Sequence, residues 1–310
     1  MLRVLFLGTP EFAVEPLEAI SKKHQIIEVV TQPDRPAGRG LGILPPPIKK
    51  KAQQLGLPVF QVEKILPEHH KRFEAMNIDV AVVVAFGQIL KTKFIKMPRL
   101  GCVNLHSSLL PRWRGAAPIH WALLSGDVET GVTVMRIVEK LDAGNILLTK
   151  KTPISCEDTV TILHDRLAHM GAQAMIEALD LLESGHVKEL EQEEALVTYA
   201  TKLTKEMQWL DLTQSAEVLD RKIRALNPWP GTSVRIKDRG RLKIKAAGVQ
   251  AHVNVAPGQI VEKNGMILLG SSSGALELKK LQWEGKPSVG PAEFLNGLKG
   301  QGLGLPLATI

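Results

Sequence analysis

The chain has 310 residues, 44% of them apolar and 23% charged, which is typical of soluble globular proteins. This length suits two domains. No stretch approaches the roughly 20 apolar residues of a membrane-spanning helix, so no membrane contact is expected. The apolar run Val4–Leu7 is too short for a signal sequence. With only two cysteines, Cys102 and Cys156, we expect no disulfide framework and a cytoplasmic location.

The net charge of +7 is distributed unevenly along the chain. It is +5 over residues 1–179, −4 over 180–204 and +6 over 205–310. A basic C-terminal third favours contact with a polyanion such as nucleic acid, although many basic proteins bind none.

Short runs rich in Val, Ile and Leu alternate with helix-sized segments over the first 150 residues. The predicted strands are Arg3–Leu7, Ile26–Thr31, Val80–Ala85 and Val103–Leu105. The predicted helices between them are Pro10–Ser21, Ile48–Leu55 and Glu68–Met76. This alternation predicts an α/β domain with a doubly wound sheet, whose ligands bind beyond the carboxyl ends of the strands.

The pattern changes in the second half of the chain. Asp158–Ser184 is predicted to form one long helix, and the acidic segment Lys188–Thr204 an interdomain linker. After a helix at Ser215–Ala225, short strands separated by turn residues predict a small antiparallel barrel from Thr232 onward. The expected domains are residues 1–187 and 205–310, joined by the linker 188–204.

The residues after the predicted strand Cys102–Leu105 offer the clearest chemistry. Asn104 and His106 are two apart, so an extended backbone points both side chains the same way. The amide can stabilise a developing oxyanion and the imidazole can move a proton. The alternative is that both only satisfy nearby backbone groups.

Asp142 follows the alternating strand Val132–Val138 and lies in a turn before Gly144. Such a position also suits a purely structural Asx turn. Together with the amide and imidazole, its carboxylate suits transfer of a group between nitrogen atoms. Gly8-Thr9-Pro10 replaces a dinucleotide-binding GxGxxG, and HExxH and CxxC spacings are absent, so no metal is expected.

Several motifs resemble those of the folate-dependent formyltransferases. Asn104-Leu105-His106, Ser108-Leu109-Leu110-Pro111 and Leu141-Asp142-Ala143-Gly144 resemble the family signature. Gly8–Ala13, Gln32–Gly40 and Arg114–Ile119 are similar to motifs of the methionyl-tRNA formyltransferases within that family. The resemblance implies a Rossmann-like N-terminal domain, an OB-like C-terminal barrel and 10-formyltetrahydrofolate as the formyl donor. It implies Asn104, His106 and Asp142 as the catalytic residues, and Ser108, Leu109, Leu110 and Pro111 as folate-binding residues.

Two basic regions are candidate contacts for methionyl-initiator tRNA, the acceptor that the resemblance implies. The loop Gln32–Lys51 carries Arg35, Arg39 and Lys49, and Arg39 matches the arginine to which the family assigns the acceptor end. Leu41-Gly42 follow where family members commonly carry lysines.

Further on, alternation places Arg235, Lys237, Arg241, Lys243 and Lys245 on one face of a predicted hairpin, as phosphate contact requires. Each basic region can also be a merely solvated surface.

Three rival hypotheses remain. The first keeps the chemistry but changes the acceptor to an amino sugar nucleotide or a purine precursor, which would need neither basic region. A non-catalytic RNA-binding protein would not need the Asn, His and Asp, and a nicotinamide oxidoreductase would need the missing glycine motif. We expect a monomeric enzyme that formylates methionyl-initiator tRNA for translation initiation.

Overall fold

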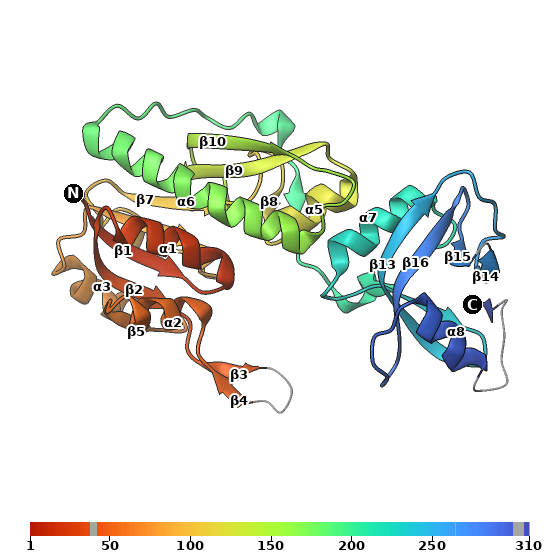
Figure 1. Cartoon of the computed structure of the whole chain (residues 1–310). Helices are drawn as coiled ribbons and strands as arrows, with labels where there is room; N and C mark the ends of the chain where they lie inside the picture. The colour runs from red at the N-terminus through yellow and green to blue at the C-terminus, as the bar shows by residue number, and fades with distance from the viewer. Residues whose placement is uncertain (38–41, 264, 300–306, 310) are drawn as a thin grey trace. The chain divides into compact units, whose positions relative to one another are not determined.

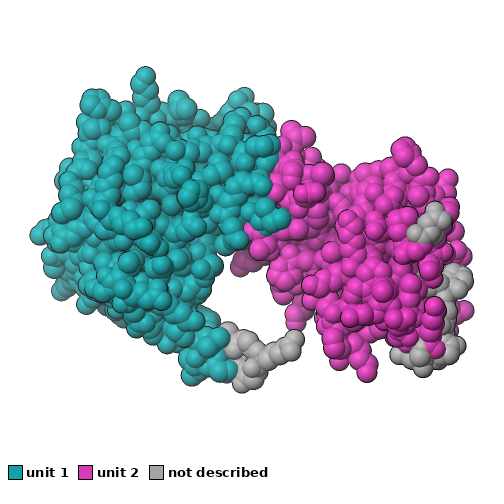
Figure 2. Space-filling view, viewed as in Figure 1, with its two compact units in different colours: residues 1–118, 129–153, 162–200 teal, residues 119–128, 154–161, 201–310 magenta. Residues whose placement is uncertain are grey.

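The computed structural model describes residues 1–37, 42–263, 265–299 and 307–309. The chain forms two compact units, coloured teal and magenta in Figure 2. Unit 1 comprises residues 1–118, 129–153 and 162–200, and unit 2 comprises residues 119–128, 154–161 and 201–310. The change at residue 200 falls inside the predicted linker. The two short excursions into unit 2, 119–128 and 154–161, have no counterpart in the predicted domain boundaries.

Unit 1 is built on a seven-stranded sheet in the order β10-β9-β7-β6-β1-β2-β5 (Figure 1). These strands are β1 (Arg3–Gly8), β2 (Gln25–Thr31), β5 (Val59–Gln61), β6 (Val80–Val84), β7 (Cys102–His106), β9 (Glu129–Arg136) and β10 (Ile146–Pro153). The first five are parallel, whereas β9 and β10 run antiparallel to their neighbours. The predicted α/β architecture is confirmed, with a mixed sheet.

Helices cover both faces of this sheet. They are α1 (Val14–Ser21), α2 (Pro47–Gln54), α3 (Pro67–Glu74), the single turn α4 (Thr92–Ile95) and α6 (Val160–Ser184), with a 3-10 turn η1 (Glu11–Ala13) before α1. On one face α1 and α6 lie side by side, and Lys23, just after α1, makes an ion pair of 2.5 Å with Asp180 of α6 (Figure 1). On the other face Phe73 and Phe94 pack edge to face, 5.6 Å apart, within the core that includes Leu5.

The 25-residue helix α6 packs closely against β7. A Cβ atom on Gly171 would lie 2.6 Å from the side chain of Leu105, so a larger residue here would force that side chain to move. Within the ranges that the structure describes, no helix has the length and apolar character needed to cross a bilayer.

The strand order reverses at β1. The chain first places β2 and β5 on one side of β1, then β6 and β7 on the other. Such a reversal leaves a crevice beyond the carboxyl ends of the strands, because the connections on either side leave in opposite directions. This rule places the expected ligand site beyond the carboxyl ends of β1 and β6.

Three short pieces complete unit 1. β3 (Arg35–Ala37) and β4 (Gly42–Leu44) pair antiparallel, and β8 (Arg114–Gly115) pairs parallel with β11 (Tyr199–Ala200). A 3-10 turn, η2 (Glu194–Leu196), precedes β11. Part of the predicted linker thus forms a strand, β11, which pairs with β8 of unit 1.

Unit 2 contains a six-stranded antiparallel sheet in the order β12-β13-β16-β15-β14-β17. The strands are β12 (Ser233–Ile236), β13 (Gly240–Gln250), β14 (Gln259–Lys263), β15 (Met266–Gly270), β16 (Ala275–Trp283) and β17 (Leu307–Ala308). The helices of this part of the chain are α5 (Pro118–Ser125), η3 (Lys205–Gln208), α7 (Ala216–Leu226) and α8 (Pro291–Lys299). Ser215 caps α7 by accepting a hydrogen bond from the Val218 amide, and the apolar face of α7 joins the core of the sheet.

The predicted antiparallel β-domain is confirmed, but the OB-like barrel is not. The two edge strands meet at a single bridge between Ile236 and Thr309, beside a 3.0 Å hydrogen bond from the Lys237 amide to the Ala308 carbonyl. No continuous ladder closes the sheet among the residues described, so the barrel stays a prediction. The structure shows a sheet whose edges touch at one point.

Candidate active site

A cavity of about 110 Å³ opens in unit 1 beside the carboxyl ends of β6 and β7. Its walls come from three stretches of the chain. These are the end of β6 with the loop after it, β7, and the end of β9 with the loop after it. The lining residues are Val83, Gln88, Ile89, Leu90, Asn104, Met135, Arg136, Ile137, Val138, Glu139, Leu141 and Asp142. Two of the three predicted catalytic residues therefore face the same cavity.

Asn104 lies in β7, where it pairs with Val83 of β6 and Met135 of β9. Its side chain makes no hydrogen bond within the described part of the chain, although it lines the cavity. An amide group held by a central strand and left without a protein partner can donate to a bound molecule.

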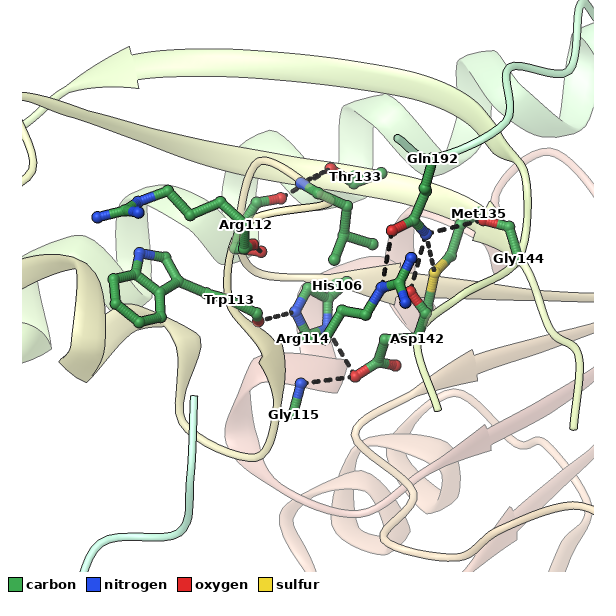
Figure 3. A network of polar contacts seen from close by, with 12 residues as sticks. His106, Arg112, Trp113, Arg114, Gly115, Thr133, Met135, Asp142, Gly144 and Gln192 are labelled. Carbon is green, nitrogen blue, oxygen red and sulfur yellow. Dashed lines mark hydrogen bonds and ion pairs between the residues drawn. The ribbon is translucent and has the colours of Figure 1, made fainter. Parts of the chain in front are cut away.

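His106 is buried at the end of β7 and has a fixed orientation (Figure 3). Its Nε2 lies 2.8 Å from the carbonyl oxygen of Trp113. Because a carbonyl only accepts, Nε2 carries a proton. The other ring nitrogen, Nδ1, faces Asp142 with 3.8 Å between Nδ1 and Oδ2. Only Nδ1 is therefore free to gain or lose a proton during a reaction.

Asp142 lies in the loop after β9, in a backbone conformation with a φ of 49°. Its Oδ2 accepts a hydrogen bond of 2.8 Å from the Gly115 amide, and the same atom is the one that faces His106 (Figure 3). The structural role considered from sequence is present, since the carboxylate does hold a backbone N–H. The structure also brings Asn104, His106 and Asp142 together, as predicted.

The predicted folate-binding residues lie in the loop that follows His106. Ser108 is fully buried, and its hydroxyl donates to the Arg112 carbonyl at 2.6 Å. The Leu110 amide donates to the Thr133 hydroxyl, which in turn donates to the Ser108 carbonyl. None of Ser108, Leu109, Leu110 and Pro111 lines the cavity, so their folate contact remains a prediction.

The apolar residues on the cavity rim are not among the predicted site residues. Ile89, Val138 and Leu141 are 76%, 44% and 55% exposed, although they are large and hydrophobic. Clustered exposed apolar side chains beside a few polar groups are typical of a binding site for an organic molecule. Their positions just after β6 and β9 could have been singled out by the rule that ligands bind beyond strand ends.

The residues of the loop Gln32–Lys51 that are predicted to contact the acceptor end differ in how closely an acidic side chain approaches them. Arg39 lies outside the described residues. Arg35 is exposed, with Glu63 3.6 Å away. Lys49 makes an ion pair with Asp34, which lowers the pKa of the Asp34 carboxyl below its ordinary value. The Lys49 charge is thus already neutralised locally.

The predicted basic hairpin forms as β12 and β13. Val234, Ile236, Leu242 and Ile244 are buried and their basic neighbours point away, as the alternation predicted. Arg235 stacks over Trp209 at 4.6 Å, while Lys237 and Lys245 are exposed.

Arg241 differs from the other basic residues of this hairpin, because it forms an ion pair with Glu284 and donates to Gln208. Lys243 and Lys245 line a separate hollow of about 100 Å³. Of the five basic side chains predicted to share this face, four have no acidic partner among the described residues, namely Arg235, Lys237, Lys243 and Lys245.

Comparison with known proteins gives two family matches. Residues 2–179 match the family model described as formyl transferase, and residues 202–299 match the one described as formyl transferase, C-terminal domain.

Solved structures share this fold at low sequence identity. HypX from Aquifex aeolicus is 18% identical with a TM-score of 0.66, over 96% of this chain and 49% of HypX, so this chain spans about half of that protein. WlaRD, a sugar 3N-formyl transferase, is 19% identical with a TM-score of 0.67, over 93% of this chain and 99% of its own. An N-formyltransferase from Helicobacter canadensis is 18% identical with a TM-score of 0.68, over 89% and 98% respectively.

Proposed function

Since this chain belongs to the formyl transferase family, we propose that it transfers the formyl group of 10-formyltetrahydrofolate to the α-amine of methionyl-initiator tRNA. One observation carries the proposal. The amide of Asn104 and the carboxylate of Asp142 line one cavity, and the Nδ1 of His106 faces that same carboxylate. A neutral donor, a proton carrier and an anion are the groups that transfer between two nitrogens requires.

The cavity suits the proposed donor. Ile89, Leu90, Val138 and Leu141 offer apolar surface for a flat heterocycle, and Asn104 and Asp142 supply polar groups. HypX has been crystallised with tetrahydrofolic acid, and the Helicobacter canadensis enzyme with folinic acid. When bound, the donor supplies an electrophilic formyl carbon attached to nitrogen. In this chain, the rim residues would hold the ring system and leave that carbon near Asn104.

Asn104 and His106 would act on different atoms of the reaction. The acceptor amine forms a bond to the formyl carbon while the bond from that carbon to the donor nitrogen breaks. A free α-amine titrates at roughly 7.7–8.0 and the aminoacyl ester lowers this pKa, so much of the acceptor amine is neutral near pH 7. Asn104 donates to the formyl oxygen as that oxygen gains negative charge. His106 moves the amine proton toward the departing nitrogen through Nδ1, because Nε2 is held by Trp113. Asp142 balances the charge on the imidazole while the proton is in transit.

Two basic regions support tRNA as the acceptor. The unpaired side chains Arg235, Lys237, Lys243 and Lys245 share one hairpin of unit 2, where they can contact phosphates without sequence selectivity. In the segment Gln32–Gly40, Arg35 is exposed and Arg39 is the proposed contact with the acceptor end. An acceptor as small as an amino sugar would need neither region.

Formyl transfer from labelled 10-formyltetrahydrofolate tests the proposal directly. Met-charged initiator tRNA should be labelled, whereas elongator Met-tRNA, free methionine and a dTDP-linked amino sugar should not. The His106→Ala variant serves as the inactive control. Labelling of the amino sugar with no labelling of initiator tRNA would replace the proposed acceptor while keeping the chemistry. Labelling of none of the four would refute the proposed function.

A further inference from the structure

The segment 189–200, predicted as a linker, makes a series of contacts with the loops that carry His106 and Asp142. In β11, Ala200 accepts a hydrogen bond from the Ala116 amide, and β11 pairs with β8 over two residues. Thr198 accepts from the Trp113 amide through its hydroxyl and from the Arg114 amide through its carbonyl. Three backbone amides of the loop 113–116, those of Trp113, Arg114 and Ala116, therefore donate hydrogen bonds to the segment 189–200.

The loop 113–116 also forms hydrogen bonds with both groups that are proposed to handle protons, His106 and Asp142. The Trp113 carbonyl holds Nε2 of His106, and the Gly115 amide holds Oδ2 of Asp142. A Cβ atom on Gly115 would lie 2.6 Å from the Ala200 carbonyl oxygen, so the approach of the two strands depends on glycine. Any movement of the segment 189–200 would be transmitted to His106 and Asp142 through this loop.

Gln192 extends the same segment to the backbone of the Asp142 loop (Figure 3). Its Nε2 donates to the carbonyls of Asp142 and Gly144 at 2.8 and 2.9 Å. Its Oε1 accepts from Nε of Arg114 at 3.0 Å. A primary amide fits this position because it offers two donors and an acceptor at once, whereas a carboxylate cannot donate and an ammonium cannot accept.

The partner of Gln192, Arg114, is 0% exposed and is held by charge as well as by hydrogen bonds. Both of its terminal nitrogens donate to Oε1 of Glu194, at 3.1 and 3.0 Å. Hydrogen bonds from Lys140 and Arg114 lower the pKa of the Glu194 carboxyl below its ordinary value. A buried guanidinium needs such a partner, because an unpaired buried charge is strongly destabilising. Arg114 is thereby a rigid support for the Gln192 amide.

The Asp142 loop has a conformation that needs external support. Its φ of 49° is uncommon for a residue with a side chain, although Asp tolerates it better than most. Two residues later, a Cβ atom on Gly144 would lie 1.9 Å from the Arg136 carbonyl oxygen. Gln192 donates hydrogen bonds to the carbonyls of Asp142 and Gly144, which lie on either side of this turn. The direction of the Asp142 carboxylate therefore depends on a contact made by its own backbone.

We propose that Gln192 is a positioning residue that, supported by Arg114 and Glu194, fixes the Asp142 carboxylate against Nδ1 of His106. The inference rests on the proposed function for the role of Asp142 in formyl transfer. It makes the segment 189–200 a part of the active site.

The Gln192→Met variant tests this role with little change in side-chain length. Methionine fills the space beside Met135 but can donate to neither carbonyl. We expect kcat to fall about tenfold or more, since small displacements of a reacting group can cost up to about a hundredfold. The KM values for donor and acceptor should stay within about twofold, because the contacts of the cavity are unchanged. The matched control Gln173→Met replaces an exposed glutamine of α6 and should retain wild-type kinetics.

Hydrogen exchange of the Gly115 amide gives a second measurement that needs no acceptor. This amide is bonded to Oδ2 of Asp142, so its exchange should speed up about tenfold or more in Gln192→Met, while exchange of Phe6 in β1 stays unchanged. If the Met variant unfolds, Glu194→Gln, on an exposed side chain, should give the same exchange result by weakening the support of Arg114.

The two measurements separate this inference from the proposed function. Wild-type protein that does not formylate initiator tRNA would refute the proposed acceptor, and accelerated Gly115 exchange in the variant would still support positioning by Gln192. Unchanged Gly115 exchange together with an unchanged kcat would overturn the inference. A fall in kcat equal to the fall in folded fraction, with normal exchange, would also overturn it.

Discussion

At the scale of single residues, the site depends on which atoms already have partners. Asn104 has none in the described chain, His106 has one nitrogen committed and one facing Asp142, and Asp142 holds the Gly115 amide. These differences support the distinct tasks proposed for the three polar groups. They also show which variants separate chemistry from folding.

Replacing Asn104, His106 or Asp142 with alanine should lower kcat at least about a hundredfold, because groups that handle protons typically contribute 10²–10⁴-fold. The fold should persist, since none of the three belongs to the apolar core. The measurement is formyl transfer to charged tRNA together with a thermal unfolding curve. Alanine variants of the exposed residues His186 and Asp165 serve as matched controls. Near-normal turnover in all three site variants would contradict the assignment.

The two cysteines should differ sharply in reactivity. Burial raises the pKa of the Cys102 thiol to about 12, whereas Cys156 is exposed. A thiol reagent at pH 8 should therefore modify one cysteine per chain in the native protein and two after unfolding. Replacing Cys156 with serine should abolish the native reaction. Modification of both cysteines in the native state would show that Cys102 is accessible.

The same burial predicts a loss of stability at high pH. The unfolded chain releases the Cys102 proton near its ordinary pKa of 9, while the folded chain retains it until about 12. The contribution to the free energy of unfolding is therefore complete below pH 9 and declines as the pH rises toward 12. Urea unfolding across this range should show a smaller decline for Cys102→Ala than for the wild type. Equal slopes for the two proteins would contradict this effect.

At the scale of elements, the hairpin of β12 and β13 combines a buried apolar face with a basic exposed face. The Arg241 side chain is already paired with Glu284, so the exposed face has less free charge than the sequence indicated. The remaining four basic side chains define the surface on which phosphate contact can be tested.

Changing Arg235, Lys237, Lys243 and Lys245 together to glutamine should raise the KM for tRNA more than it lowers kcat. For every phosphate that the variant no longer neutralises, the slope of log K against log salt should flatten by about 0.7–0.9, because fewer counterions are released. The control removes the same charge from four exposed lysines of unit 1: Lys22, Lys71, Lys151 and Lys188. An unchanged slope in the hairpin variant would remove this surface from tRNA binding.

At the scale of the whole molecule, the two units carry different parts of the proposed activity. The cavity and the three proposed catalytic residues belong to unit 1, whereas the basic hairpin belongs to unit 2. Each unit has its own apolar core, so ligand binding can stabilise one without the other. The donor and the acceptor should therefore leave separate signatures.

Hydrogen exchange should reveal this division. Saturating 5-formyltetrahydrofolate should slow exchange at residues 88–90 and 137–142 and leave residues 233–245 unchanged. At a concentration a hundred times its Kd, a ligand adds about 2.7 kcal/mol to the stability of the state that binds it. Adding initiator tRNA should then slow exchange at residues 233–245. Donor-induced protection confined to unit 2 would contradict the placement of the cavity.

The order of the amino acids was enough to predict many of the elements and to propose a chemistry for the main motif. Runs such as Val80–Val84 predicted the buried strands, because strands covered on both faces have few polar residues. Alternation predicted the two faces of β12 and β13, and spacing placed Asn104 and His106 on one side of β7. These are local properties, fixed by backbone period and side-chain polarity.

Which polar groups are free and which are held became visible only in the folded chain. No pattern in the sequence indicates that Gln192 reaches the carbonyls of Asp142 and Gly144, because those residues lie 50 and 48 positions away along the chain. Nor does any pattern show that Arg241 and Lys49 have acidic partners, or that Ile89 and Val138 meet at one cavity. Pairing of this kind depends on how the loops at the sheet edge come together. A one-dimensional pattern does not encode those distances.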